Sequence, residues 1–589
     1  MKKIIITVVF LMAFLFSCTN SRPQLNYNTY IEAADPDSAD YSDQWSKVGE
    51  MQSSFGSVNI RYSKSATPDL TSKYDWKGTI WKGEKKSAML VIWTPENLKQ
   101  VECVFSSFKG DNGKILDSQI AKAQFVRYTL TDSYGEGCAE RSHLTPSLAA
   151  DVLDTIPGID MEAKTTRPVW LSFNIPSEAE AGIYKGVVEI YVEGTKKKEL
   201  DITLKVLDRT LPSPKDWQYH LDLWQHPTSV ARINNVEVWS EEHWELMKTP
   251  MKMLADAGQK VITATLNKDP WNHQCYDGYE DMILWTRKMD GSWQYDYKIF
   301  DRWVQFMMDL GIKNYINCYS LAPWNNEIHY FDEKEGKMID VSAKPGTKEF
   351  RDLWYPFLQN FKTHLQEKGW LEITNIAMDE RSPEIMNATL KLLKNAAPEL
   401  GVALADNHKS YKQYPWLRDI CVEYGAEFDN ADLKYRRENG LISTFYTYCG
   451  TEFPNAFTFS DPAECVFISW HAMAAGYDGF LRWAYNSWNE NPLHDSRYKT
   501  WSAGDAFIIY PAGRSSIRFE RLIEGIQDFE KIRILKDEFA KNGENEKLNV
   551  LLEELNKFNF LGKPNRPCSE MVDEAKRVLD SLSEEAPKS

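Results

Sequence analysis

The fold is decided by the stretch Ile373-Thr374-Asn375-Ile376-Ala377-Met378-Asp379-Glu380-Arg381-Ser382-Pro383. Its first part, up to Met378, has the apolar character of a buried strand, and two acids stand where that strand ends. Ser382 followed by Pro383 is typical of a helix start, because serine caps the first free N–H groups and proline fits the first helical position. The stretch therefore predicts a strand that runs directly into a helix, which is the unit of an α/β domain.

Outward from this stretch, residues 217–485 alternate strands with helices. Amphipathic helices are expected at Ser240–Gly258, at Phe300–Gly311 and after Ser382. The expected strands are Tyr219–Trp224, Lys260–Leu266, Asn314–Ser320, Ile373–Glu380, Val402–Asn407, Ile420–Tyr424, Ile442–Cys449 and Gly479–Tyr485. Strands and helices in this alternation indicate a (β/α)8 barrel. A doubly wound sheet would need a glycine-rich phosphate turn after its first strand, and that turn is absent.

The chain before the barrel has the pattern of an all-β sandwich. Its short β-branched or aromatic segments are bounded by turn residues, and no long helical period interrupts them. These segments are Ser57–Lys64, Ala88–Thr94, Val101–Phe108, Val169–Ile175, Val187–Val192 and Leu200–Leu207. The predicted organisation is a signal peptide (1–17), a tether and lead-in (18–56), the β-sandwich (57–212), the barrel (213–512) and a helical C-terminal segment (513–589) with helices at Ser516–Phe539, Asn545–Phe558 and Glu570–Leu582.

The N-terminus has the pattern of a bacterial lipoprotein signal. Lys2 and Lys3 precede the apolar run Ile4–Phe16, which is too short to span a membrane comfortably. The run ends in Leu15-Phe16-Ser17-Cys18, which resembles the lipobox at which such signals are cut and the cysteine is lipidated. We therefore expect lipidation of Cys18 and a mature chain anchored to a bacterial membrane, on the periplasmic side or at the cell surface. The alternative is an ordinary secretory signal with a chance cysteine.

The other cysteines lie at positions 103, 138, 275, 318, 421, 449, 465 and 568. Export permits disulfides, but these spacings form no compact disulfide framework. Several of them, including Cys318, Cys421 and Cys449, sit in apolar strand-like runs. We expect most of them to be free and buried. No CxxC motif or His–Cys cluster indicates a metal site, and no cofactor is expected.

The composition limits the class of function. The 589 residues carry a formal net charge of −16, which disfavours nucleic acid as the main partner. A mean hydropathy of −0.49 excludes a multispanning membrane protein. Aromatic residues make up 13% of the chain, with 21 Trp, 28 Tyr and 27 Phe. Rings in this number either provide flat walls for sugars or fill a large aromatic core.

Asp379 and Glu380 are the candidate catalytic residues. They stand at the C-terminal end of the fourth barrel strand, and that end of such barrels carries the active site. The alternative role of their negative charge is to favour the N-terminus of the next helix. Successive strand residues point to opposite faces, so both acids reach one pocket only if the strand ends, twists or bulges there.

An adjacent acid pair fits one kind of glycoside hydrolysis better than the others. Ordinary glycosidases hold their two acids at set separations across the sugar. In substrate assistance, by contrast, the sugar's own 2-acetamido oxygen attacks the anomeric carbon. One carboxylate then orients the acetamide and balances the oxazolinium charge, while the other protonates the leaving oxygen and later activates water. This chemistry needs no cofactor, because nothing is oxidised and the leaving group needs only a proton.

Candidates for sugar binding come from the other strand ends. A donor to the acetamide carbonyl is needed, and Tyr446 or Tyr448 on the seventh strand could supply it. The other candidates are Trp483, Tyr485 and Trp488 for an aromatic wall, and Asn407, Asn317, His220 and Asp222 for sugar hydroxyls. Each of these residues could equally be core or mere lining. In particular, His220 and Asp222 could satisfy each other inside the barrel.

Several blocks together resemble glycoside hydrolase family 123. They are the lipobox, the β-sandwich, Met378-Asp379-Glu380-Arg381-Ser382-Pro383, Gly479-Phe480-Leu481-Arg482-Trp483-Ala484-Tyr485, the region from Gly504-Asp505 to Tyr510-Pro511, Ser516-Ile517-Arg518-Phe519-Glu520-Arg521 and Gly525-Ile526-Gln527-Asp528. The resemblance covers roughly residues 57 to 535. The Asp-Glu dipeptide is weak alone, whereas its combination with the late blocks is fairly specific.

The resemblance implies an exo-acting β-N-acetylgalactosaminidase that works with retention and substrate assistance, as the family 20 hexosaminidases do. It implies that Asp379 orients the acetamide and that Glu380 is the general acid/base. The expected partners are a glycan with terminal N-acetylgalactosamine and, through Cys18, a membrane. Two alternatives stay open: a non-catalytic glycan-binding lipoprotein, and a glycosidase of other specificity that pairs Glu380 with a distant carboxylate such as Glu423 or Glu427.

Overall fold

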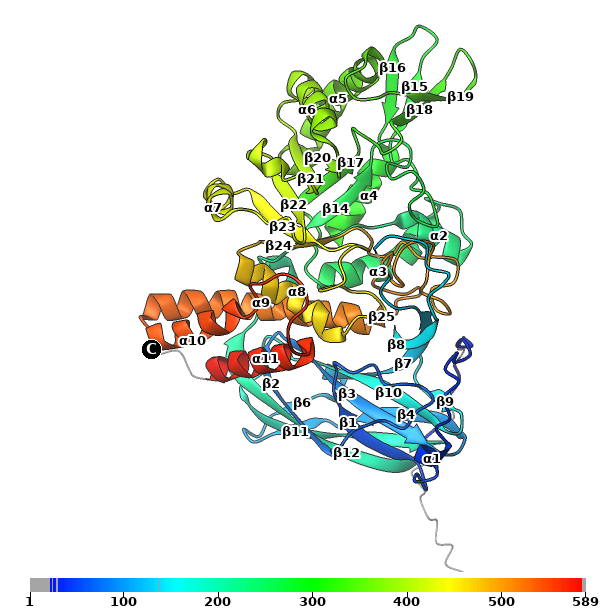
Figure 1. The fold of residues 1–589 in the computed structure, drawn as a ribbon, viewed down its shortest axis with the longest axis vertical. Helices are drawn as coiled ribbons and strands as arrows, with labels where there is room; N and C mark the ends of the chain where they lie inside the picture. Colours follow the sequence, from blue (N-terminus) through cyan, green and yellow to red (C-terminus); the bar gives the residue numbers. More distant parts are fainter. Residues whose placement is uncertain (1–21, 24, 28–29, 136, 585–589) are drawn as a thin grey trace, which may run out of the picture.

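The computed structural model describes residues 22–23, 25–27, 30–135 and 137–584. Within these residues it has a β-sandwich at one end, a parallel barrel at the other and a group of C-terminal helices between them (Figure 1). The fold class predicted from the sequence is confirmed. No helix among these residues combines the length and apolar character needed to cross a membrane.

The β-sandwich has two sheets, preceded by a short helix, α1 (Ser42–Trp45). The first sheet has the order β1 (Gln52–Gly56), β3 (Lys85–Thr94), β10 (Thr165–Asn174), β7 (Ala121–Thr131), β8 (Ser147–Leu153) and β25 (Ser515–Ser516). The second has the order β2 (Asp75–Lys82), β12 (Thr195–Thr210), β11 (Gly182–Val192), β4 (Leu98–Phe105) and β9 (Ile159–Met161), with β5 (Phe108–Gly110) paired to β11 and β6 (Ile115–Leu116) paired to β5. Most neighbours are antiparallel, but β2 and β12 are parallel.

Strand β3 explains why the first sheet reads as apolar. Leu90 faces the core between the two sheets, whereas its neighbour Met89 faces a second cluster under the N-terminal segment. The strand is therefore buried on both faces and lacks polar alternation. The prediction of a strand at Ser57–Lys64 was wrong, because the strand of this region is β1, which ends at Gly56. The sequence also missed β2, β7 and β8.

The barrel has eight parallel strands, and each predicted strand is present. In spatial order they are β13 (His220–Leu223), β24 (Gly479–Arg482), β23 (Ile442–Tyr446), β22 (Asp419–Glu423), β21 (Gly401–Asp406), β20 (Thr374–Asp379), β17 (Tyr315–Tyr319) and β14 (Val261–Thr265). Neighbours in sequence are neighbours in space throughout, as a singly wound barrel requires.

Glutamine side chains complete the barrel between β13 and β14, where the regular ladder is missing. The amide of Gln259 accepts from the Leu223 N–H at 3.0 Å and donates to the Val261 carbonyl at 2.8 Å. The amide of Gln225 accepts from the Thr263 N–H at 2.9 Å. Both glutamines are buried. Their amides thus satisfy backbone groups that a strand ladder would otherwise pair.

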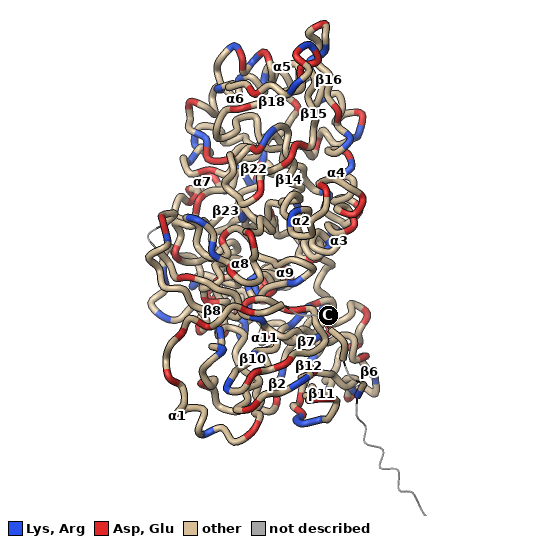
Figure 2. Tube along the Cα trace, turned by 90° about the vertical axis from the view of Figure 1, so that its right-hand side faces the viewer, with Lys and Arg blue, Asp and Glu red and all other residues tan. Residues whose placement is uncertain are grey.

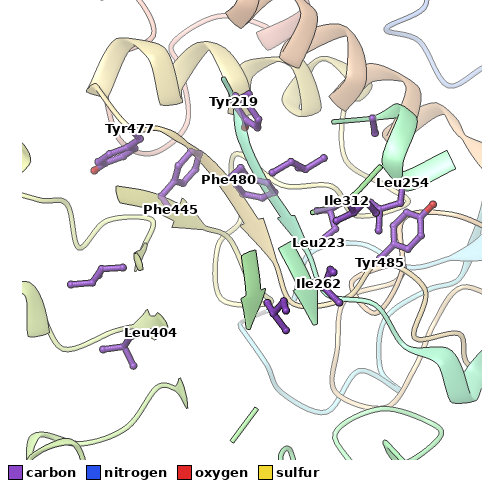
Figure 3. Packing of buried hydrophobic residues seen from close by; sticks show 14 of the residues in the cluster. Tyr219, Leu223, Leu254, Ile262, Ile312, Leu404, Phe445, Tyr477, Phe480 and Tyr485 are labelled. Carbon is purple, nitrogen blue, oxygen red and sulfur yellow. The ribbon is translucent and has the colours of Figure 1, made fainter. Parts of the chain in front are cut away.

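The barrel strands alternate between a helix-facing side and an inner side. Leu223 and Ile262 belong to the large core between strands and helices, and Figure 3 shows them packed there beside Leu254. Trp224, Tyr319 and Ala377 belong instead to a smaller cluster inside the barrel. This alternation follows from the two-residue period of a strand. It places Leu223 outward and Trp224 inward on the first strand.

Helices follow the barrel strands: α2 (Pro227–Asn234), α3 (Glu241–Asp256), α4 (Lys298–Asp309), α5 (Lys348–Lys368), α6 (Pro383–Ala396), α7 (Asn430–Glu438) and α8 (Pro462–Ala475). The predicted starts at Ser240 and Ser382 are confirmed, since each serine side chain accepts a backbone N–H of the first turn. The predicted ends at Gly258 and Gly311 are confirmed as well, because both glycines have positive φ just past a helix.

The two long connections after the second and third barrel strands form a small sheet of their own. Its order is β16 (Trp293–Asp296), β15 (Leu284–Arg287), β18 (Glu327–Asp332) and β19 (Lys337–Ser342). The sheet extends beyond the barrel at the end opposite the sandwich (Figure 1). The sequence analysis did not predict that these two connections pair.

The predicted C-terminal helices are α9 (Ile517–Asn542), α10 (Asn545–Asn556) and α11 (Cys568–Glu584). Helix α9 takes the position of the eighth barrel helix and packs along α8 (Figure 1). Just before α9, β25 pairs with β8 of the sandwich. The chain therefore returns to the sandwich before it completes the barrel's helix layer. Figure 2 shows acidic and basic residues interspersed along the whole trace.

Candidate active site

Asp379 and Glu380 line one cavity of about 240 Å³. Strand β20 ends at Asp379, and Glu380 has a φ of 48°, in the left-handed region. This break in the strand turns the second acid out of the alternating pattern, so both side chains reach the same space. The other lining residues are Cys138, Trp224, Gln274, Trp324, Ala405, Tyr446, Tyr448, Cys449, Leu481, Trp483, Trp501 and Asp505.

Asp379 lies against aromatic rings. Its Oδ2 accepts a hydrogen bond from the Trp271 indole N–H at 3.1 Å. Burial, followed by the nearby charge of Glu380, raises the pKa of Asp379 to about 7, while the Arg381 charge opposes this shift. Arg381 itself bonds the Asp379 backbone carbonyl at 2.8 Å and stacks over the Trp324 ring. Burial and the neighbouring acid thus both favour the neutral form of this carboxyl.

Glu380 has a different set of neighbours. The Tyr446 hydroxyl donates to its Oε1. Burial raises the pKa of Glu380, and the charge of Glu423 acts in the same direction, whereas the Tyr446 hydrogen bond lowers it. A carboxyl that keeps its proton above the usual pH range can serve as a general acid near neutrality. The two adjacent acids thus have different hydrogen-bond partners, Trp271 for Asp379 and Tyr446 for Glu380.

Tyr446 and Tyr448 both line the cavity, and their ring centroids are 6.1 Å apart. The Tyr448 hydroxyl donates to Glu423 Oε1 at 2.8 Å. Glu423 is the last residue of β22 and lies opposite Tyr446 of the adjacent strand β23, so Tyr448 holds this third acid beside the pair. The structure therefore assembles three carboxylates and two phenols at the C-terminal ends of β20, β22 and β23.

Tryptophan side chains form the walls of the cavity, and only one of the tryptophans that line it was a candidate from the sequence. Trp483 lies there as a predicted candidate, with its ring centroid 5.6 Å from that of Trp501. Trp271 and Trp324 come from the long connections after β14 and β17, and Trp501 from the excursion after β24. The Trp content of the first two connections was a usable signal, but which ring turns inward depends on tertiary packing.

A disulfide between Cys138 and Cys449 also borders the cavity. Cys138 lies in the loop between β7 and β8 of the sandwich, and Cys449 follows β23 of the barrel. The Tyr134 hydroxyl of the same loop bonds the Gly450 carbonyl at 3.0 Å. The sandwich thus contributes part of the active-site wall. The prediction that most cysteines are free holds for the other six described ones, but Cys449 is bonded.

His220, Asp222 and Asn317 lie inside the barrel rather than along the cavity. His220 Nε2 is 3.4 Å from Asp419 Oδ2, and Asn317 Nδ2 is 3.5 Å from Asp222 Oδ2. Asn375 donates to Asn317 Oδ1 at 2.9 Å. These residues face inward, but they stand early or midway in their strands and so lie below the catalytic end. His220 and Asp222 have different nearest partners, although the charge of each favours the ionised form of the other.

Three further candidates also lie away from the cavity lining. Tyr485 is buried in the layer between strands and helices, where its hydroxyl bonds the Pro250 carbonyl at 2.8 Å and its ring lies near Leu254 (Figure 3). Trp488 is buried in the same core and donates to the Ile509 carbonyl. Both follow the end of β24, where strand parity no longer applies. Asn407 is exposed after β21. Cys18 lies outside the described residues.

The arrangement can transfer protons and stabilise positive charge in a space walled by rings. Such a space suits one sugar ring, whose apolar faces pack on indoles while its hydroxyls meet carboxylates. Within the described part of the chain, no group of three or more His, Cys, Asp or Glu side chains could hold a metal ion. The geometry thus favours acid/base chemistry on a bound sugar.

Comparison with curated proteins finds no match. Among solved structures, two distant glycan-active enzymes resemble the chain too weakly to support an argument. A Bacteroides ovatus GH5 xyloglucanase is 9% identical, with 77% of this chain and 98% of that chain covered and a TM-score of 0.28. A Thermotoga neapolitana maltogenic α-amylase is 10% identical, with 53% and 77% covered and a TM-score of 0.31.

A third solved structure is far more similar. It is a family 123 glycoside hydrolase from Clostridium perfringens, studied for glycolipid glycan hydrolysis, with 28% identity, a TM-score of 0.81, and 90% of this chain and 98% of that chain covered. The family model "Glycoside hydrolase 123, catalytic domain" matches residues 224–535, and "Glycoside hydrolase 123 N-terminal domain" matches residues 55–192. The catalytic match spans more than half of the chain and contains Asp379 and Glu380. The chain therefore belongs to glycoside hydrolase family 123.

Proposed function

We propose that this chain is a retaining exo-glycosidase that removes terminal β-linked N-acetylgalactosamine through an oxazolinium intermediate. The observation that carries the proposal is the adjacent pair Asp379 and Glu380 in one small cavity. A two-acid glycosidase needs carboxylates across the sugar from each other, whereas the acetamide-assisted reaction needs both near one side of the anomeric centre. The cavity of about 240 Å³ suits a single terminal sugar.

The first step of the proposed reaction forms the oxazolinium ion. Glu380 gives its proton to the leaving oxygen as the acetamide oxygen attacks the anomeric carbon and the glycosidic bond breaks. Asp379 accepts a hydrogen bond from the acetamide N–H and balances the positive charge that develops on the ring. That charge favours the ionised form of Asp379, whose pKa of about 7 in the free protein leaves it ready to lose its proton.

The second step returns the enzyme to its starting state. Glu380, now ionised, takes a proton from water as the water oxygen attacks the anomeric carbon and the acetamide leaves. Two inversions at one carbon give net retention. Tyr446 and Tyr448 are the phenols available to the acetamide carbonyl, and Tyr446 lies nearer the acid pair because it already bonds Glu380.

Glycoside selectivity tests this function. The mature protein is assayed on the 4-nitrophenyl β-glycosides of N-acetylgalactosamine, N-acetylglucosamine and galactose. We expect cleavage of the first and none of the last, because galactose has no acetamide to attack. Cleavage of galactose would require an enzymic nucleophile and would overturn substrate assistance. Inactivity on all three would favour the glycan-binding alternative.

Two variants separate the roles of the acids. Glu380→Gln should abolish turnover of natural glycans. It should spare oxazolinium formation from a 2,4-dinitrophenyl glycoside, because the dinitrophenolate leaves without being protonated. Asp379→Asn should slow both substrates by about 100-fold or more, because charge stabilisation is lost in either case. Glu384→Gln is the matched control, since Glu384 lies four residues along on the exposed face of α6. Its activity should equal the wild type.

A second candidate is favoured by one observation. Glu423 lies close enough to raise the pKa of Glu380, and Tyr448 holds it in place. A glycosidase could use Glu380 as acid and Glu423 as nucleophile or base. Glu423→Gln would then abolish cleavage, including that of sugars without an acetamide. In the preferred mechanism the same variant stays active on N-acetylgalactosaminides.

We also propose that the chain is exported and anchored by lipid at Cys18, so that it meets glycans outside the cytoplasm. The disulfide between Cys138 and Cys449 supports export, because cytosolic proteins seldom keep disulfides. The relative from Clostridium perfringens, described with glycolipid glycans, supports a cell-surface type of substrate. Cys18→Ala should release the protein from the membrane fraction, and fatty-acid labelling of the wild type should fail in this variant.

A further inference from the structure

Asp505 has a feature that catalysis by Asp379 and Glu380 leaves unused. It lies in the excursion after β24 and lines the same cavity, yet its side chain is only 1% exposed. Trp483 and Trp501, which border this cavity, come from the same part of the chain. A buried carboxylate at the edge of a sugar-sized cavity is costly unless something pairs with it.

Arg482 supplies only half of that pairing. Its guanidinium donates to Asp505 Oδ1 at 2.8 Å and to Asn455 Oδ1 at 3.0 Å, and the arginine side chain is fully buried. Arg482 thus holds Oδ1 of Asp505, while Asn455 holds the guanidinium. Burial raises the pKa of Asp505, while the Arg482 charge and the Trp483 indole oppose that rise, so the ionised form has local support.

The other oxygen, Oδ2, makes no hydrogen bond of normal geometry within the described residues, although it is buried. Buried polar atoms in folded proteins are almost always paired, and a charged one left unpaired costs more than a neutral one. Arg141 of the sandwich loop lies near enough to favour the charge. Its Nε bonds Asp132 and its Nη2 the Ser133 carbonyl, while its Nη1 is also buried without a hydrogen bond in the described part of the chain. Within that part, Oδ2 is thus an acceptor without a partner of normal geometry, on a residue that lines the cavity.

We propose that Asp505 is a sugar-binding residue whose Oδ2 accepts a hydrogen bond from a ring hydroxyl of the terminal sugar. The inference rests on the proposed function for the identity of that sugar and adds a specificity-determining residue to it. A carboxylate only accepts, so its partner is a donor: a hydroxyl, given that the acetamide N–H goes to Asp379. Arg482 is then a positioning residue, because it acts on the sugar only through Asp505.

The competing explanation is that Asp505 merely neutralises the buried Arg482. In that case its loss would weaken the enzyme equally toward every substrate. A direct hydrogen bond behaves differently, because a site built to pair with a hydroxyl strongly rejects the analogue that lacks it. The two explanations therefore separate in a cycle that removes the hydroxyl, the carboxylate, or both.

The experiment measures kcat/KM for the 4-nitrophenyl β-glycoside of N-acetylgalactosamine and for its 3-, 4- and 6-deoxy analogues. With the wild type, one analogue should lose about 100-fold, as expected for a hydrogen bond to a charged group. Asp505→Asn should lower kcat/KM for the parent glycoside by a similar factor. For the sensitive deoxy analogue, the same substitution should lower kcat/KM little further. Equal losses for every analogue in wild type and variant would overturn the proposal.

Two further measurements keep the outcomes distinct. Asp495→Asn makes the same change in the same excursion, at a half-exposed residue that bonds Arg497, and it should keep wild-type ratios. If Asp505→Asn does not fold, the wild-type data decide alone. The proposal is then overturned if none of the deoxy analogues loses more than about 5-fold in kcat/KM. If the parent glycoside is not hydrolysed, the proposed function fails, and the same ratios are read from calorimetric dissociation constants of the free sugars.

Discussion

At the scale of single residues, burial raises the pKa of Glu380, and two neighbours adjust it in opposite directions. The Tyr446 hydroxyl stabilises the ionised carboxylate and lowers its pKa, whereas the Glu423 charge destabilises that form and raises it. The general acid works only while protonated, so the alkaline limb of kcat/KM follows the pKa of this acid in the free enzyme. The limb therefore reports the local electrostatics directly.

Two variants should move this limb in opposite directions. Glu423→Gln removes a negative charge, lowers the pKa of Glu380 and shifts the alkaline limb to lower pH. Tyr446→Phe removes a hydrogen bond to the ionised form, raises the pKa and shifts the limb to higher pH. Each shift should be about one pH unit, the size expected from one nearby charge or hydrogen bond. A pH series of kcat/KM from acid to alkaline measures both, and two shifts of the same sign would contradict the assignment.

At the scale of elements, the barrel depends on side chains where its ladder is incomplete. Gln259 pairs with backbone groups of β13 and β14 and is 3% exposed. Gln259→Leu should leave the buried Leu223 N–H unpaired, while Gln225 still bonds the Val261 carbonyl at 3.3 Å, and lower the free energy of unfolding by about 1–3 kcal/mol. Gln305→Leu is the control, because the Gln305 amide bonds only Asp309 on the exposed face of α4. Thermal unfolding of both proteins tests this, and equal midpoints would contradict it.

The elements were predictable where local signals agree. The barrel strands could be identified because they are apolar and buried, and β20 is followed in addition by a capped helix start at Ser382 and Pro383. The small sheet of β15, β16, β18 and β19 was missed because its pairing joins two separate connections. Strand β2 was missed because its N-terminal half is partly exposed and mixed in polarity.

The candidate site was predictable in part, for similar reasons. Asp379 and Glu380 could be found because they lie at a strand end, and Tyr446, Tyr448 and Trp483 because they lie at or just after one. The alternation of strand faces does not apply beyond the strand ends. Tyr485 and Trp488 were therefore predicted to line the site, but both lie in the core. The sequence carries no local signal for how close to the catalytic end of its strand a side chain lies. His220, Asp222 and Asn317 were therefore predicted as sugar-binding residues, although they lie inside the barrel. Cys138 and Asp505 reach the cavity through tertiary folding alone.

At the scale of the whole molecule, the sandwich and the barrel share one wall of the cavity. The disulfide between Cys138 and Cys449 joins positions 311 residues apart. Its removal in the Cys138→Ser, Cys449→Ser double variant should cost about 3 kcal/mol of stability. It should raise KM more than it lowers kcat, because the sandwich loop lines the cavity while the acid pair lies on β20. Calorimetry and kinetics test this, and a variant with unchanged KM would show that the loop stays closed without the bond.

Arg518 joins the sandwich, the barrel and the C-terminal helices at one buried point. From the start of α9, its Nε bonds Asp151 of β8 at 2.8 Å, and neither side chain is exposed. A second nitrogen of the guanidinium bonds the carbonyls of Ala456, Gly504 and Phe507 at 2.8–3.0 Å. One cation thus satisfies a buried acid and three buried carbonyls that come from distant parts of the chain.

Arg518→Met keeps most of the volume but removes these bonds. It leaves Asp151 with Tyr510 and the half-buried Arg61, so we expect a loss of about 3–5 kcal/mol and a lower midpoint in calorimetry. Arg577→Met on the exposed face of α11 should leave the midpoint unchanged. An unshifted midpoint for Arg518→Met would mean that the parts hold together without it. Because Gly504 precedes Asp505, the same variant should also loosen the cavity wall and raise KM, so stability and sugar binding fail together if both depend on this point.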